Sequence, residues 1–279
     1  MKKSFLLLLF LFSVCAGAAE CRKHFQAFVG ASEKGEPFFF ENKFNNYVIT
    51  FRYTNPSPTQ PPSVLAGMPA PVNLNGFSRY SFTRLIVNGI DSKNLEPKKY
   101  EIFNKGNRAG VDVLYNFNGV KMTLRFEMDD TSPLLQMTWI RGKDVPAGAI
   151  KNISIAFHVM PCASLEKRNS YCREIVTPRG TLKSPAGVPR KRHKLNAKDS
   201  FMILQDGKYQ PGKAPKITSP VLLKPDWKTL RSGVAVFGTA QDMSISFELD
   251  PSAESWKFGL LDTPKRRNNA AFAAFVKSL

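Results

Sequence analysis

The sequence predicts an all-β fold, an antiparallel β-sandwich that carries a loop-rich basic insertion and a short C-terminal helix. About a dozen short segments with alternating apolar and polar residues follow one another, and turn signals separate them at close spacing. Strand-like and helix-like segments do not alternate as they would in a parallel α/β sheet. Of the 279 residues, 43% are hydrophobic, which is enough for a large core. We therefore expect one sandwich domain over residues 19–279.

A hairpin over residues 111–128 is the clearest element. Its turn is Asn118-Gly119, the strongest short hairpin signal, because both turn positions require a positive φ. A two-residue loop places Phe117 opposite Val120 and fixes the register outward from there. The apolar residues that then share one face are Val111, Val113, Tyr115, Phe117, Val120, Met122, Leu124 and Phe126. The other face pairs Asp112 with Arg125 and Asn116 with Lys121.

Further strands are predicted on both sides of this hairpin by alternation and by β-branched and aromatic residues. They cover residues 46–53, 76–89, 99–103, 133–141, 150–160, 233–238, 243–249 and 256–261. Residues 55–71 interrupt the series with six prolines, which remove backbone donors, so this segment is predicted to be a stiff surface loop.

The segment 161–232 differs in composition from the rest of the chain. It contains eight prolines and only short apolar runs, and residues 165–231 carry sixteen Lys or Arg against five Asp or Glu. We interpret it as a basic, proline-rich elaboration of the sandwich, not as a second domain. The cluster from Arg190 to Lys194 is predicted to be a solvated loop within it.

The chain ends in a predicted helix over residues 268–279. Phe272, Phe275, Val276 and Leu279 follow the i, i+3, i+4, i+7 spacing of one helical face. We expect this helix to dock on the sandwich, since it is too short to span a membrane.

Residues 1–18 resemble a secretory signal peptide. Lys2 and Lys3 precede an apolar run, and Ala16-Gly17-Ala18 fits the small-residue cleavage rule, so cleavage is expected near Ala18. The predicted location is secreted or periplasmic, and no later segment is a predicted transmembrane helix.

An exported protein meets an oxidising compartment, where cysteines can form disulfides. Cys162 and Cys172 bracket a short polar loop, and we predict a disulfide between them. A bond from Cys21 to either of them stays open. With three histidines and no CxxC motif, no metal site is expected, and no cofactor either.

The formal net charge of +18 suggests an anionic partner. In an exported protein the candidates are an acidic or sulfated polysaccharide, phospholipid head groups or a cell-envelope polymer. Nucleic acid is not expected, and diffuse charge that serves solubility is the competing interpretation. The candidate ligand-binding residues are Arg79, Arg84, Arg190, Lys191, Arg192 and Trp227, the tryptophan because its polar, proline-flanked segment favours exposure.

Two stretches carry a family resemblance. They are GVDVLYNFNGVKMTLRFEMDDTSPLLQMTWIRG (110–142) and IKNISIAF (150–157). Their succession of a hairpin, an LRFE strand and a D-x-SPLL turn is similar to the central part of galactose-mutarotase-like supersandwich domains. Such domains occur in sugar epimerases and beside the catalytic domains of polysaccharide lyases and glycosidases.

The resemblance implies catalysis by His residues and a Glu acting as acid and base on the ring oxygens. His158 is the single histidine on a predicted sheet face, and Glu127 is the candidate carboxylate, so these two are the catalytic candidates. No nucleophile elbow, phosphate-binding loop or HExxH motif is present. The first hypothesis is therefore non-catalytic binding of an anionic glycan or envelope polymer. A carbohydrate-active epimerase or lyase and a structural accessory protein of an envelope assembly are the alternatives.

Overall fold

The computed structural model describes residues 20–25, 47–52, 83–95, 98–105, 108–129, 132–159, 172–185, 191–207, 220–238, 243–262 and 277. Within these ranges almost all regular structure is strand. The strands are β1 (Glu20–Phe25), β2 (Tyr47–Arg52), β3 (Thr83–Val87), β4 (Ile90–Asp91), β5 (Lys99–Lys105), β6 (Arg108–Phe117), β7 (Val120–Asp129), β8 (Ser132–Arg141), β9 (Ile153–Val159), β10 (Cys172–Thr177), β11 (Gly180–Pro185), β12 (Lys191–Leu195), β13 (Met202–Asp206), β14 (Val221–Pro225), β15 (Leu230–Phe237), β16 (Met243–Leu249) and β17 (Ser255–Asp262). Short 3-10 turns are η1 (Ser92–Asn94), η2 (Ala147–Ala149) and η4 (Trp227–Thr229).

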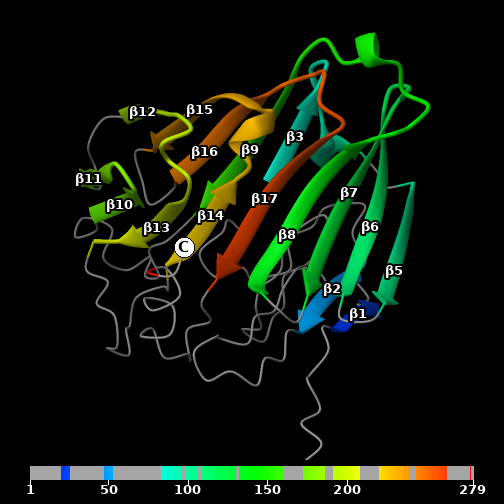
Figure 1. Ribbon diagram of the computed structural model, residues 1–279, viewed down its shortest axis with the longest axis horizontal. Helices are drawn as coiled ribbons and strands as arrows, with labels where there is room; N and C mark the ends of the chain where they lie inside the picture. The colour runs from blue at the N-terminus through cyan, green and yellow to red at the C-terminus, as the bar shows by residue number, and fades with distance from the viewer. Residues whose placement is uncertain are drawn as a thin grey trace, which may run out of the picture.

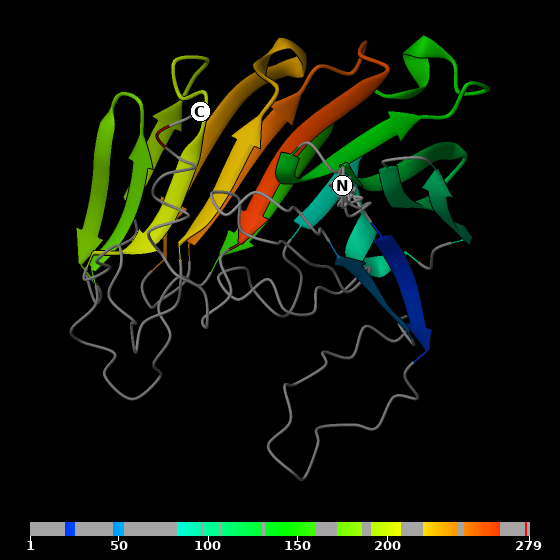
Figure 2. The same cartoon turned by 60° about the horizontal axis from the view of Figure 1, so that its bottom comes forward.

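Two antiparallel sheets form the body of the protein (Figure 1). One has nine strands in the order β11-β10-β13-β14-β17-β8-β7-β6-β5, and the other has six in the order β12-β15-β16-β9-β3-β4. A separate pair, β1 and β2, lies against β5 and β6 (Figure 2). The predicted all-β antiparallel sandwich is confirmed.

The core lies between the two sheets, because alternate residues of each strand point toward the other sheet. Phe157 of β9 and Phe258 of β17 come from different sheets, and their ring centroids are 5.1 Å apart. Trp139 of β8 is 1% exposed and lies 5.5 Å from Tyr115, as the alternation of its strand predicts. These large rings fill the space between the sheets and hold them at a fixed separation.

The predicted hairpin is confirmed in every paired position. β6 and β7 pair Phe117 with Val120 and Val111 with Phe126, and the turn residues Asn118 and Gly119 have φ values of 51° and 93°. The described side chains of the apolar face are buried, with exposures of 7% or less at Val113, Tyr115, Phe117, Val120, Met122, Leu124 and Phe126. On the other face Arg125 donates two hydrogen bonds to Asp112, of 2.7 and 2.6 Å.

The described parts of segment 161–232 contain more strand than its proline content led us to expect. They supply β10, β11, β13 and β14 to the larger sheet, and β12 to the smaller one. The described part of the cluster that we predicted as a solvated loop, Lys191 to Lys194, lies in the edge strand β12, and its Lys and Arg side chains are exposed. Three of the described prolines lie where they do not interrupt a strand: Pro178 is in a turn, and Pro185 and Pro225 end their strands.

Other sequence predictions lie outside the described residues. These are the proline-rich loop over residues 55–71 and the C-terminal helix, of which only Lys277 is described, exposed and in helical conformation. No helix within the described part of the chain has the length and apolar character needed to cross a membrane.

The hairpin turn yields a stability prediction. Gly119→Ala leaves no steric clash, since nothing lies within 4 Å of an added Cβ, but it forces alanine to a φ of 93°. We expect a loss of about 1–2 kcal/mol in the free energy of unfolding, the typical cost of left-handed backbone for an L-residue. Urea denaturation measures it.

Gly148→Ala is the matched control, because its added Cβ also meets open space and its φ is not positive. Equal stabilities of the two variants would contradict the assignment of strain to the turn.

Candidate anion-binding face

The edge strand β12 has the sequence KRHKL, and its side chains alternate between the core side and the outer face of the sheet. Leu195 is 4% exposed and packs in the core, and His193 lies on the same side, with its ring 5.5 Å from the ring of Phe237. Arg192 and Lys194 point to the opposite side, the outer face of the six-stranded sheet. One apolar residue and one half-buried ring thus anchor a strand that displays cations outward.

The cations of β12 are exposed and available to a partner. Lys191, Arg192 and Lys194 are all exposed, and among the described residues none of their side chains takes part in an ion pair. Arg192 and Lys194 are two residues apart on one face, about 6.6 Å along the strand. That separation is shorter than the Debye length of about 8 Å at physiological salt, so their potentials reinforce one another.

The strand register extends this outer face across the sheet from β12 to β3. One row of paired residues reads Lys194, Val234, Ser246, Ala156 and Arg84. The neighbouring row reads Arg192, Val236, Ser244 and His158. Four interstrand spacings separate the flanking strands, which is about 19 Å. Short side chains, two of them serines, therefore lie between longer basic side chains on β12 and β3.

Arg84 is held in place on the β3 side of this face. Its Nε donates to Asp91 Oδ2 at 2.9 Å, and its Nη2 contacts the same oxygen. Asp91 belongs to β4, which pairs with β3 through the Asn88-Gly89 turn. The carboxylate neutralises part of the arginine charge, so the β12 side carries the stronger positive potential.

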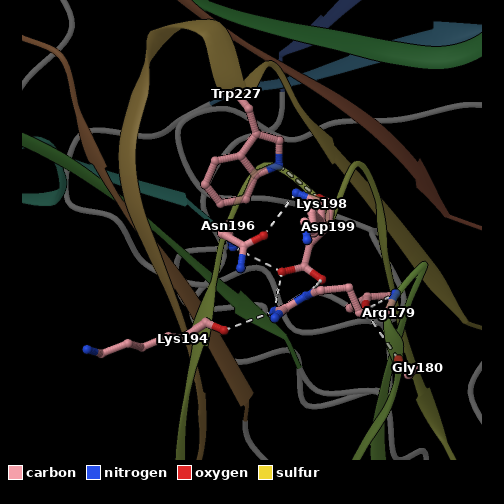
Figure 3. Close-up of polar contacts among 8 residues, drawn as sticks. Arg179, Gly180, Lys194, Asn196, Lys198, Asp199 and Trp227 are labelled. Atoms are coloured by element: carbon pink, nitrogen blue, oxygen red, sulfur yellow. Dashed lines mark hydrogen bonds and ion pairs between the residues drawn. The ribbon is translucent and has the colours of Figure 1, made fainter.

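An ion pair between a buried carboxylate and an exposed arginine fixes the turn that follows β12 (Figure 3). Asp199 is fully buried, and Arg179 donates to it from Nε at 2.7 Å and from Nη2 at 2.6 Å. Arg179 Nη2 also donates to the backbone oxygen of Lys194 at 3.1 Å. Since Arg179 follows β10 of the larger sheet and Lys194 belongs to the smaller one, this guanidinium ties the edge strand to the opposite sheet.

Asp199 is ionised within this cluster. Burial raises the pKa of its carboxyl, but hydrogen bonds from Arg179, from the Asn196 backbone N–H and from Thr177 outweigh that effect, so the pKa lies below its usual value. The same pair raises the pKa of the Arg179 guanidinium, chiefly through the hydrogen bond to Asp199. The pair is therefore charged at neutral pH.

Trp227 completes the cluster from the turn η4. Its Nε1 donates to the backbone oxygen of Asp199 at 2.8 Å, and its ring stands edge-on to Phe247, with centroids 5.5 Å apart. Gly233 lies under the indole, where an added Cβ would come within 3.0 Å of it. The ring is half-buried against the core, so its described contacts support the turn, and a stacking role toward a ligand stays a prediction.

His193 is neutral at physiological pH. Burial lowers its pKa, and the charge of Lys191 lowers it further. Burial is the larger of these two causes. The neutral ring suits its contact with the apolar face of Phe237.

The structure does not bring the two catalytic candidates together. His158 alternates with core residues of the six-stranded sheet, so it lies on that sheet's outer face, opposite Ser244. Glu127 lies on the outer face of the nine-stranded sheet, where Arg108 contacts its carboxylate. The whole core separates these two side chains.

Other predicted site residues fall outside what the structure describes. Arg79, Arg190 and Cys162 are not described, and of Cys172 only the backbone is, so the Cys162–Cys172 bond stays a prediction. Within the described residues, no three His, Cys, Asp or Glu side chains gather where they could hold one metal ion.

Sequence reasoning missed the Arg179–Asp199 pair and the serines of the outer face. The sequence did contain a turn signal next to Asp199. Asn196 and Asp199 are three residues apart after a strand, and the Lys198 N–H donates to the Asn196 side chain at 3.0 Å. The serines carry no such signal, since only the pairing of distant strands brings them between the cations.

The depressed pKa of Asp199 predicts a pH-dependent contribution to stability. Asp199→Asn should lower the free energy of unfolding near neutral pH by about 1–3 kcal/mol, because the buried network loses its negative charge and one of its two acceptor oxygens. The folded-state pKa is below the unfolded value of about 3.9. The wild-type advantage is therefore complete above that value and is lost as the pH falls through the folded-state pKa. Urea titrations from about pH 7 to about pH 3 measure it.

Asp144→Asn is the control, since Asp144 also pairs with a cation, Lys121, but is exposed. We expect a smaller loss from it. A constant difference between wild type and Asp199→Asn across the pH range would contradict the assignment.

Comparisons with known proteins return structures only. No protein-family model and no curated protein sequence matches this chain. An α-N-acetylgalactosaminidase from Bifidobacterium bifidum matches with 8% identity and a TM-score of 0.49, over 86% of this chain and 37% of that one. The galactosidase domain of an α-galactosidase–sucrose kinase matches with 10% identity and a TM-score of 0.43, over 80% and 41%. An α-galactosidase from Lactobacillus brevis matches with 8% identity and a TM-score of 0.41, over 72% and 31%.

The chain thus spans between 31% and 41% of the length of these three enzymes. At these identities and TM-scores the matches assign neither a family nor an activity to it.

Proposed function

We propose that this chain is an exported β-sandwich protein that binds an anionic glycan or another anionic envelope polymer through β12 and the outer face of the six-stranded sheet. The observation that carries the proposal is the set of exposed, unpaired cations Lys191, Arg192 and Lys194 on an edge strand whose described surroundings offer them no carboxylate. The cleaved signal peptide, the Cys162–Cys172 bond and the galactose-mutarotase-like resemblance belong to the same proposal.

The outer face suits an extended, polyhydroxylated anion. Arg192 and Lys194 supply charge at one border, Arg84 supplies weaker charge at the other, and Ser244 and Ser246 place hydroxyl groups between them. Hydroxyls donate and accept hydrogen bonds with sugar hydroxyls, while guanidinium and ammonium groups favour carboxylates and sulfates. A polymer that lies across the strands would contact both the basic side chains and the serine hydroxyls.

Binding is favoured over catalysis by the separation of His158 from Glu127. General acid–base catalysis requires both groups within hydrogen-bonding reach of one substrate, and here they lie on opposite faces of the sandwich. The position of β12 favours binding further. Arg179, which pairs with Asp199, also binds the backbone oxygen of Lys194 and so holds the C-terminal end of β12 in place without a ligand.

Edge protection is the competing explanation of the cations. Lysines on an exposed sheet edge prevent pairing with the edge of another molecule. Removal of the charge would then cause self-association and leave the affinity for a polyanion unchanged, so the two explanations predict different outcomes.

The test is a triple variant, Lys191→Gln with Arg192→Gln and Lys194→Gln, on heparin and polygalacturonate columns. We expect elution at lower salt and a dissociation constant raised by about 3- to 150-fold, because three exposed ion pairs of about 0.2–1 kcal/mol each amount to about 0.6–3 kcal/mol. Isothermal titration with a heparin oligosaccharide gives the dissociation constant, and light scattering reports self-association.

Lys143→Gln with Lys151→Gln and Lys257→Gln is the control, because it removes the same charge from three exposed lysines on other elements. Equal loss of affinity in both triple variants would show that binding follows net charge alone, and the proposal would fail.

A further inference from the structure

Two Asn-Gly turns in this protein share their sequence and their backbone conformation. Asn88-Gly89 joins β3 to β4, and Asn118-Gly119 joins β6 to β7. The φ values are 50° and 83° in the first turn and 51° and 93° in the second, and all four residues are exposed. Because the dipeptide, the backbone and the exposure match, a difference in reactivity between the two asparagines follows from the contacts that each turn makes.

Three hydrogen bonds hold the side chain of Asn88. Its Nδ2 donates to the backbone oxygen of Ala149 at 2.7 Å. Its Oδ1 accepts from the backbone N–H groups of Lys151 and Asn152, at 2.8 and 3.3 Å. These partners lie 61 to 64 positions further along the chain. The amide of Asn88 is therefore part of the tertiary structure, and it is released only when the turn separates locally from the residues that precede β9.

The side chain of Asn118 has no anchor of this kind. Among the residues that the structure describes, none forms a hydrogen bond with its amide group. A different side chain, that of Asn116, accepts from the backbone N–H of Gly119 at 2.7 Å. The amide of Asn118 is therefore free to rotate in solvent, while the backbone nitrogen that follows it is restrained by one hydrogen bond.

An asparagine that precedes glycine can lose its side-chain amide in water. The backbone nitrogen of the glycine attacks the asparagine Cγ, and the new N–C bond closes a succinimide ring. The side-chain nitrogen leaves as ammonia, which carries away the proton of the backbone N–H. Water then opens the ring at either carbonyl and yields aspartate or isoaspartate, without an oxidant or a cofactor. Glycine allows the attack because it has no Cβ to hinder the close approach of its backbone.

The number of hydrogen bonds that the reaction breaks differs between the two turns. At Asn88 it breaks the three side-chain bonds, because Cγ must turn toward the following nitrogen. At Asn118 it breaks one bond, between Gly119 and Asn116. Each ordinary hydrogen bond changes an opening equilibrium by a factor of about 2–10. Two bonds fewer therefore favour reaction at Asn118 by about 4–100-fold.

We propose that Asn118 is a site of spontaneous deamidation, that its contacts protect Asn88, and that Asn116 slows the reaction by holding the Gly119 nitrogen. The isoaspartate product carries the main chain through the former side-chain carbon, which lengthens the two-residue turn by one methylene group. Since this turn sets the β6–β7 register, that product weakens the end of the hairpin. The aspartate product leaves the main chain unchanged and adds one negative charge.

Peptide mapping of the wild-type protein, after incubation in mildly alkaline buffer, compares both sites in one sample. Mass spectrometry follows the loss of each amide, and an isoaspartate methyltransferase labels the isoaspartate. We expect conversion of Asn118 to be about 4–100-fold faster than conversion of Asn88. A synthetic peptide of residues 113–124 sets the incubation time. Equal rates, faster conversion of Asn88, or an intact Asn118 after the peptide has been converted completely would overturn the proposal.

Asn116→Ala tests the restraint on Gly119. It removes the acceptor of the Gly119 N–H, so the rate at Asn118 should rise about 2–10-fold while the rate at Asn88 stays the same. Lys121→Ala is the matched control, because Lys121 is the cross-strand partner of Asn116 and makes no bond to Gly119. An unchanged rate with Asn116→Ala, or equal increases with both variants, would overturn the role of Asn116. None of these rates depends on polyanion binding, so the outcome is independent of the proposed function.

Discussion

The two-residue alternation of side chains along antiparallel strands is the constraint on which this structure depends. The strands of the two large sheets give one set of side chains to the core between the sheets and the other set to an outer face. Phe157 and Phe258 meet across the core, and their neighbours one residue away lie on opposite surfaces of the molecule. The proposed function follows from this sorting, because it places the cations of β12 and the serines of β16 on one outer face.

The Arg179–Asp199 pair adds a second constraint where the chain crosses between the sheets. β12 belongs to the smaller sheet and β13 to the larger, so the turn between them must hold both in place. A buried carboxylate with a bidentate arginine does this with directional bonds, and the arginine also reaches the backbone of β12. The edge strand is therefore anchored on its core side while its outward side chains remain exposed to solvent.

Local pattern was sufficient to predict the parts of the fold whose partners are adjacent in sequence. The β6–β7 register was predicted residue by residue because the Asn118-Gly119 turn and the flanking apolar residues specify the same pairing. The burial of Trp139 followed from the same alternation. By contrast, β13 and β14 lie in proline-rich sequence with short apolar runs, and pairing with β10 and β17 stabilises them.

The candidate site was less predictable for the same physical reason. Arg84 and Arg192 were both candidates from sequence, but nothing local places them on one face. Their common surface arises because β12 pairs with β15, β15 with β16, β16 with β9 and β9 with β3, which joins residues more than a hundred positions apart. Asp199 was missed because the sequence does not show that the fold places Arg179 beside it.

The central claim is that a polyanion lies on β12 and the outer face of the six-stranded sheet. Hydrogen–deuterium exchange of the wild-type protein, with and without a saturating heparin oligosaccharide, tests it most directly, because β12 is the last strand of the described six-stranded sheet and has one strand neighbour in it. The account predicts slower exchange in peptides that cover residues 191–199, and unchanged exchange in those that cover the β6–β7 hairpin. Protection spread evenly over the basic surface, or confined to the nine-stranded sheet, would contradict it.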